Sequence, residues 1–209
     1  MKTNVLLMLS LLVVSVSFGQ DYRFKKVSKE ELLQKGHPLD SDVSAAILYR
    51  EVKTEFQYSE DSGWYLVTDY FERIKIYNKE GFDRANETID LYKGAGDDNL
   101  RGLRGYTYYI DSKGKVKDVK LQKEGIFTQE TTKYFTQTIV TMPDLREGCI
   151  VEYKYTINSP FIFNINEFRL QEDILVGKVN IVFKSPEYFQ YKTHQRGWVP
   201  YNVETTTKD

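Results

Sequence analysis

The chain has 209 residues, and its 29 basic and 30 acidic side chains leave a formal net charge of −1. Because the two signs are interspersed, this balance excludes the broad positive field of a nucleic-acid-binding protein, and we expect no nucleic-acid partner. With Cys149 as the only cysteine, an internal disulfide is excluded. Stability must therefore come from packing alone.

The first 20 residues have the pattern of a secretory signal peptide. Lys2 precedes an apolar run over residues 5–14, and small or polar residues follow as far as Gly19 and Gln20. A membrane-spanning helix needs about 20 apolar residues, and this run is shorter. We therefore predict cleavage near Gln20, a location outside the cytoplasm (periplasmic or secreted), and no transmembrane segment in the mature chain.

Residues 21–44 are predicted to form an N-terminal extension with one short helix. Ser28 followed by Glu31 fits a capping box, in which each side chain accepts a hydrogen bond from a free backbone amide of the other residue. Gly36 and Pro38 end the helix. No later segment sustains a helical period.

The rest of the chain alternates between strand patterns and turns. We predict strands over 45–58 and 64–77, with hairpin loops at 60–63 and 78–81, and a meander as the simplest topology. Further strands are predicted over 88–92, 105–110, 115–121, 134–141, 150–157, 178–184 and 188–193.

The clearest alternation predicts how the sheets pack. In 150–157, Val151 and Tyr153 share one face while Glu152 and Lys154 share the other. This pattern predicts one buried face and one face in water, which favours antiparallel sheets packed face to face. We therefore expect an all-β antiparallel β-sandwich over 45–204, preceded by the short helix and followed by a polar tail at 205–209.

Cysteine-based catalysis would need Cys149 together with His37 or His194. Cys149 follows a turn and opens the 150–157 strand, so we interpret it as a small buried side chain. Two histidines far apart in the chain do not make a zinc site. We expect no catalytic residue, no metal site and no cofactor.

Asp97 and Asp98, in the loop at 94–99, are binding candidates. They place carboxylates on a loop without the spacing of an EF-hand. A solvated acidic loop is the preferred interpretation, and calcium binding stays open.

Aromatic residues are abundant, with 16 Tyr, 12 Phe and 2 Trp making 14% of the chain. Most fit a buried sheet surface. Trp198 and Tyr201 lie in a polar segment, so we select them as the surface candidates for binding.

Several segments together resemble a known family. ERIKIYNKEG (72–81), TMPDLREGCIVEY (141–153), DILV (173–176) and SPEY (185–188) resemble the N-terminal domain of unknown function found in secreted transglutaminase-like proteins, typically of Bacteroidetes. The resemblance implies an all-β module that precedes a papain-like transglutaminase domain. The present sequence has no segment that matches that domain, so no catalytic residue is carried over, and we expect a longer parent protein.

Three functional hypotheses follow. The first is a non-catalytic extracytoplasmic module that binds or scaffolds in the bacterial cell envelope, with a transglutaminase-like domain or another envelope protein as partner. The second is the non-catalytic N-terminal part of a transglutaminase-like cysteine enzyme or peptidase. The third is a carbohydrate-binding module, which rests on aromatic content alone.

Overall fold

The computed structural model describes residues 22–94, 96–163, 165–197 and 200–206. The predicted signal peptide, the candidate Trp198 and the last three residues of the predicted tail lie outside this range. Strands make up 48% of the described residues and helices 8%. The predictions of a mostly-β fold and of two sheets are confirmed. No helix in the described ranges is long and apolar enough to cross a membrane.

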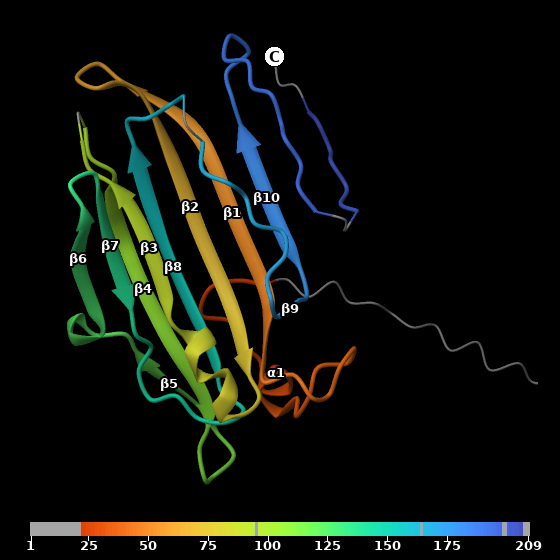
Figure 1. The fold of residues 1–209 in the computed structure, drawn as a ribbon. Coiled ribbons are helices and arrows are strands. Elements are labelled where there is room, and N and C mark those ends of the chain that lie inside the picture. The colour runs from red at the N-terminus through yellow and green to blue at the C-terminus, as the bar shows by residue number, and fades with distance from the viewer. Residues whose placement is uncertain (1–21, 95, 164, 198–199, 207–209) are drawn as a thin grey trace, which may run out of the picture.

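The larger sheet has seven strands in the order β10-β1-β2-β8-β4-β5, and β9 pairs beside β10 on β1 (Figure 1). Its strands are β1 (Ala45–Ser59), β2 (Gly63–Ile76), β4 (Asn99–Ile110), β5 (Val116–Lys120), β8 (Ile150–Ser159), β9 (Leu175–Val176) and β10 (Val179–Lys184). The ladders that join β9 and β10 to β1 are parallel, and the other ladders of this sheet are antiparallel. The prediction of purely antiparallel sheets is therefore wrong at the β1 edge.

The smaller sheet contains β3 (Glu87–Tyr92), β7 (Phe135–Val140) and β6 (Ile126–Thr132), in the order β3-β7-β6 with antiparallel pairing. The predicted meander is wrong, because β2 does not form a hairpin with the next strand. Instead the 3₁₀ helix η1 (Lys79–Ala85) follows β2 and carries the chain into the smaller sheet. A second 3₁₀ helix, η2 (Lys123–Gly125), precedes β6, a strand that the sequence did not indicate.

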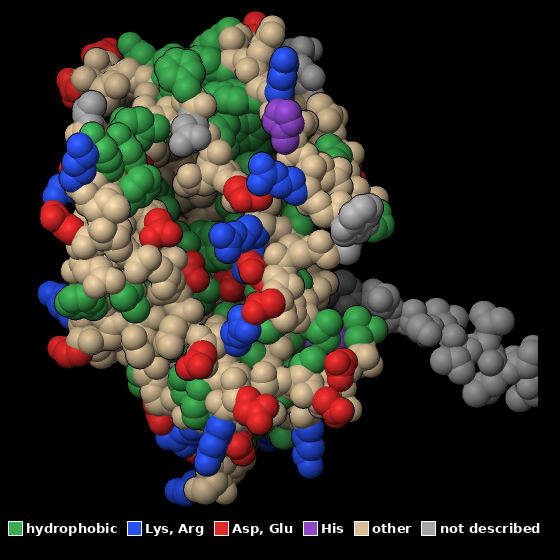
Figure 2. Space-filling view, in the orientation of Figure 1, with side chains coloured by type: hydrophobic (Ala, Val, Ile, Leu, Met, Phe, Trp, Pro, Cys, Tyr) green, Lys and Arg blue, Asp and Glu red, His purple; other side chains and the backbone are tan. Residues whose placement is uncertain are grey.

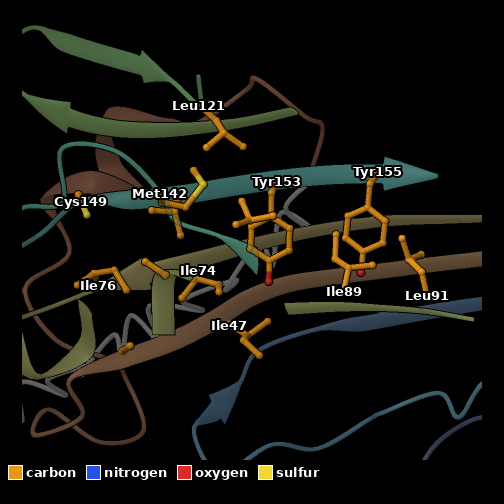
Figure 3. Close-up of a cluster of buried hydrophobic side chains, with 14 residues drawn as sticks. Ile47, Ile74, Ile76, Ile89, Leu91, Leu121, Met142, Cys149, Tyr153 and Tyr155 are labelled. Atoms are coloured by element: carbon orange, nitrogen blue, oxygen red, sulfur yellow. The ribbon is translucent and has the colours of Figure 1, made fainter. Parts of the chain in front are cut away.

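One apolar core draws side chains from both sheets (Figure 3). It includes Ile74 of β2, Val151 and Tyr153 of β8, and Ile89 and Leu91 of β3. We call the face of the larger sheet that carries Ile74 and Tyr153 its inner face. The alternation predicted for 150–157 is thus confirmed for its apolar side.

The opposite, outer face of the larger sheet is partly covered by residues 22–34. This stretch contains α1 (Lys29–Leu33), where the Ser28 hydroxyl accepts from the Glu31 amide at 3.1 Å and the Glu31 carboxylate accepts from the Ser28 amide at 2.8 Å. Leu32 packs on this face beside Ile150 of β8. The prediction that the Glu152 side of β8 faces water is wrong, because Glu152 is fully buried there.

The predicted strand at 188–193 is also wrong. Figure 1 shows the chain after β10 running back beside that strand without forming another one. Among the described residues, β10 is consequently the last strand at its end of the larger sheet.

Candidate functional site

Three of the binding candidates predicted from the sequence, Tyr201, Asp97 and Asp98, lie within the described residues. The structure does not bring Tyr201 together with the two aspartates. Tyr201 lies in the segment after β10 and is 44% exposed. Within the described residues no hydrogen bond, ion pair or ring contact links Tyr201 to the 94–99 loop.

Asp97 and Asp98 shape the turn between β3 and β4. One oxygen of Asp97 accepts from the Gly94 amide at 3.0 Å, and one oxygen of Asp98 accepts from the Tyr92 amide at 2.8 Å. Carboxylates that accept local backbone amides in this way stabilise tight turns. Across the described part of the chain, no group of three or more His, Cys, Asp or Glu side chains is placed to hold a metal ion.

Cys149 is buried in the apolar core, and burial raises the pKa of its thiol. This environment disfavours the thiolate that a nucleophile requires. Of the two histidines, His37 accepts from the Leu39 amide at 3.2 Å, and His194 is exposed. The structure therefore supports the interpretation of Cys149 as a small buried side chain.

A polar cluster lies within the inner face, and we call it the inner cluster. It consists of Arg50, Tyr70, Glu72, Glu87, Tyr153, Tyr155 and Glu172. Glu72 is its centre, since it accepts from the Tyr70 hydroxyl at 2.7 Å and the Tyr153 hydroxyl at 2.8 Å. The Arg50 guanidinium pairs with the same carboxylate and also reaches Glu172 at 2.8 Å.

Glu87 of β3 joins the smaller sheet to this cluster. The hydroxyls of Tyr153 and Tyr155 both lie 3.1 Å from its carboxyl oxygens. A tyrosine hydroxyl has a single proton, so Tyr153 cannot donate to Glu72 and Glu87 at once. Burial, reinforced by the negative charge of Glu72, raises the pKa of Glu87 to about 7. A protonated Glu87 donates a hydrogen bond and removes the conflict.

A carboxyl group with a pKa near neutrality beside a tyrosine is a familiar acid–base pair. Here, however, Tyr153 and Glu72 are buried, with 1% and 2% of their surfaces exposed. Figure 2 shows acidic and basic side chains around a hollow in the middle of the face seen in Figure 1. Because Tyr153 and Glu72, at the centre of the inner cluster, are shielded from solvent, we interpret this cluster as a polar connection between the sheets.

A second polar cluster lies on the outer face, and we call it the outer cluster: Arg73, Glu31, Glu152 and Lys75. The Arg73 guanidinium donates to Glu31 at 2.7 Å and to Glu152 at 2.8 Å. It also donates to the carbonyl oxygens of Arg23 and Lys26, each at 3.0 Å. Lys75 donates to the carbonyls of Leu32 and Gly148 at 2.7 and 2.6 Å. These contacts fix residues 22–34 on the sheet.

Aromatic rings from distant parts of the sequence gather where the β1–β2 hairpin meets the segment after β10. We call this set the aromatic surface: Phe56, Tyr58, Trp64, Phe183, Tyr188, Phe189 and Tyr191. Trp64 contacts Tyr58, Tyr188 and Phe189, with ring centroids 5.4, 5.8 and 5.6 Å apart.

The aromatic surface is far from fully covered. Tyr58 and Tyr188 are 60% and 62% exposed. The sequence shows both stretches as aromatic, but the pairing of one with the other depends on the parallel placement of β10 beside β1. No local pattern carries that information.

Comparison with known proteins finds weak similarity to solved structures. No family model matches the sequence, and no curated protein does. Among solved structures, a protein from Parabacteroides distasonis, whose description as a protease is provisional, is similar at a TM-score of 0.42 and 12% identity. The similarity covers 56% of this chain and 23% of that one.

Proposed function

We propose that this protein is a non-catalytic β-sandwich module that works outside the bacterial cytoplasm, where it binds or scaffolds another protein of the cell envelope. The signal-like first 20 residues support the location. The shared core of the two sheets supports the sandwich. The aromatic surface is the observation that carries the binding role.

Exposed tyrosines on an aromatic base are suited to protein recognition. Tyr and Trp give large contact areas with few rotatable bonds, and they are enriched at the centres of protein interfaces. Tyr58 and Tyr188 stand on Trp64, and Phe189 also contacts Trp64. A partner that covers the two tyrosines gains apolar contact on rings that are already held in place.

The second candidate is the non-catalytic N-terminal part of a transglutaminase-like enzyme or peptidase. One observation favours it: residues 185–188, which are part of the family resemblance, lead into the aromatic surface through Tyr188. In that case the partner is a catalytic domain of the same parent protein. The buried Cys149 is then a structural residue of the module.

The binding role is tested by substituting the exposed tyrosines. The double variant Tyr58→Ser and Tyr188→Ser removes the two rings, and Phe127→Ser with Tyr134→Ser is the control, because both of those side chains are also exposed. Proximity labelling in the bacterium that carries the gene is expected to mark a protein that is lost from the first variant and kept in the control. Identical labelling for all three proteins contradicts the proposal.

Hydrogen exchange of the purified protein supplies a second test. Amides of β8 are expected to exchange slowly, because β8 lies between two neighbouring strands. Amides of residues 185–197 and 200–206 are expected to exchange quickly and to become protected when the partner is added. Slow exchange throughout the isolated protein means that no surface awaits a partner there. Cell fractionation tests the location separately.

A further inference from the structure

A groove of about 770 Å³ lies on the outer face of the larger sheet, next to the start of the covered region. Its floor crosses four neighbouring strands, because Glu51 of β1 lies opposite Phe71 of β2, Phe71 opposite Lys154 of β8, and Lys154 opposite Arg104 of β4. Three steps between strands, at about 4.8 Å each, make this row about 14 Å long. Residues 22–24 line one side of the groove.

Positive charge accumulates at the β8–β4 end of this row. Arg104 is exposed and Lys154 half-buried, and neither forms an ion pair with a carboxylate of the described residues. The Lys154 ammonium lies over the Phe24 ring, 4.8 Å from its centroid. In a chain whose net charge is −1, two neighbouring cations without a carboxylate partner indicate a place for an anionic group of a ligand.

The β1–β2 end of the groove adds hydrogen-bond acceptors, Glu51 and Asp69, beside the cations Lys53 and Lys178. Glu51 accepts from Lys53 at 2.7 Å, and from Asn180 and the Tyr49 hydroxyl at 3.1 Å each. One oxygen of Asp69 accepts from the Thr156 hydroxyl at 2.6 Å. A carboxylate has about four acceptor positions, so both groups keep capacity for further donors such as ligand hydroxyls.

Aromatic rings form the adjoining wall. Tyr22 stacks on Tyr49 with centroids 4.7 Å apart and ring planes 5° from parallel, and Phe24 meets Phe71 edge to face at 5.8 Å. Tyr22 and Phe24 are half-buried, so part of each ring is open to the groove. Such partly open rings can contact the apolar C–H surface of a ligand.

We infer that this groove binds an acidic oligosaccharide, a sugar chain that carries carboxylate groups. Arg104 and Lys154 take a carboxylate, Asp69 and Glu51 accept from hydroxyls, and the rings of Tyr22 and Phe24 contact the sugar carbons. An acidic peptide fits less well. A peptide that binds by strand addition needs a free strand edge, whereas the groove floor is the face of a sheet whose strands are already paired. This inference does not rest on the proposed protein-binding role.

The test measures binding of hexagalacturonate, a chain of six uronic acids, to the purified protein by isothermal titration calorimetry. A neutral hexasaccharide and hexaglutamate are the comparison ligands. We expect hexagalacturonate to bind and the neutral sugar to bind at least tenfold more weakly, since it lacks the groups that Arg104 and Lys154 recognise. Hexaglutamate binding as tightly as hexagalacturonate contradicts the sugar assignment, and no binding of hexagalacturonate overturns the inference.

Two variants locate the site. Arg104→Gln is expected to weaken hexagalacturonate binding about tenfold, the effect of one lost charge-assisted hydrogen bond. Lys117→Gln is the matched control, because Lys117 is an exposed cation on β5 outside the groove lining. Equal weakening in both variants means that binding follows overall charge, which overturns the inference. The Arg104 side chain is exposed and forms no hydrogen bond in the described residues, so its replacement leaves the fold intact.

Discussion

The inner and outer clusters are centred on consecutive residues of β2, Glu72 and Arg73, yet their chemistry differs. Glu72 points to the inner face, and Arg73 points to the outer face. In the outer cluster, one guanidinium reaches two carboxylates and two backbone carbonyls of a segment far away in the sequence. In the inner cluster, tyrosine hydroxyls crowd around carboxyl groups, and Glu87 holds a proton with a pKa of about 7. The outer cluster fixes residues 22–34 in place, whereas the inner cluster contains a carboxyl group that titrates near neutral pH.

The largest effect is expected from Arg73→Met. The variant leaves Glu31 and Glu152 buried without their cation, and it frees the carbonyls of Arg23 and Lys26. Removing one partner of a buried ion pair costs about 3–5 kcal/mol of unfolding free energy. Urea denaturation at pH 7 measures this loss.

Arg84→Gln is the control for that variant. Arg84 pairs with Asp173 on the surface, where both side chains are exposed. A loss within about 0.5 kcal/mol is expected there. A similarly small loss for Arg73→Met contradicts the anchoring role of the outer cluster.

The inner cluster is expected to make stability depend on pH. In the unfolded chain the pKa of Glu87 is 4.5, whereas in the folded chain it is about 7. The folded state therefore binds more protons between these values, and stability falls as pH rises from 4.5 to 7, by about 3 kcal/mol for this group.

Glu87→Gln, which stays neutral at every pH, is expected to flatten that decline. Burial also raises the pKa of Glu152, so part of the decline remains in the variant. Thermal unfolding at pH 5 and pH 7.5 measures the difference, with the exposed Glu60→Gln as control. An unchanged slope in Glu87→Gln would show that the proton resides elsewhere.

A smaller loss is expected from Tyr153→Phe. The variant removes the hydroxyl that lies between Glu72 and Glu87, so each carboxyl loses a partner in a buried site. The cost is about 2 kcal/mol. Tyr65→Phe is the control, because its hydroxyl contacts Gln57 at an exposed position. Equal urea midpoints for the two variants speak against a polar connection between the sheets.

The smallest effect is expected from Ser28→Ala. It removes the helix cap of α1, which carries Glu31 into the outer cluster, and costs about 1 kcal/mol. Hydrogen exchange is expected to speed up in residues 22–34 and to stay unchanged in β3. Faster exchange in both regions contradicts the view that the two clusters are separate.

The sequence predicted the features that depend on near neighbours. Most strands follow from alternation and turn residues, and the Ser28–Glu31 cap is a four-residue pattern. The burial of Glu152 could not be predicted in this way. Alternation assigns a residue to a face of the sheet, but the cover of that face comes from residues 22–34, more than a hundred positions earlier.

The candidate sites show the same difference between local contacts and contacts that are distant in sequence. Asp97 and Asp98 stood out as a local acidic loop, and they bond to their own turn. The aromatic surface and the groove each combine strands that are distant in sequence. No pattern in the sequence links their side chains, because only the strand order brings them together.

The parallel pairing of β10 with β1 also determines when, during synthesis of the chain, the larger sheet can be completed. Glu51 and Asn180 are partners across 129 residues, so this ladder forms only after almost the whole described chain has been synthesised. Contacts of such long range are slow to form, because a long loop must close first. Until then β1 has one unpaired edge, which can pair with another chain. The interval between the synthesis of β1 and that of β10 is therefore the period in which this protein is most exposed to aggregation.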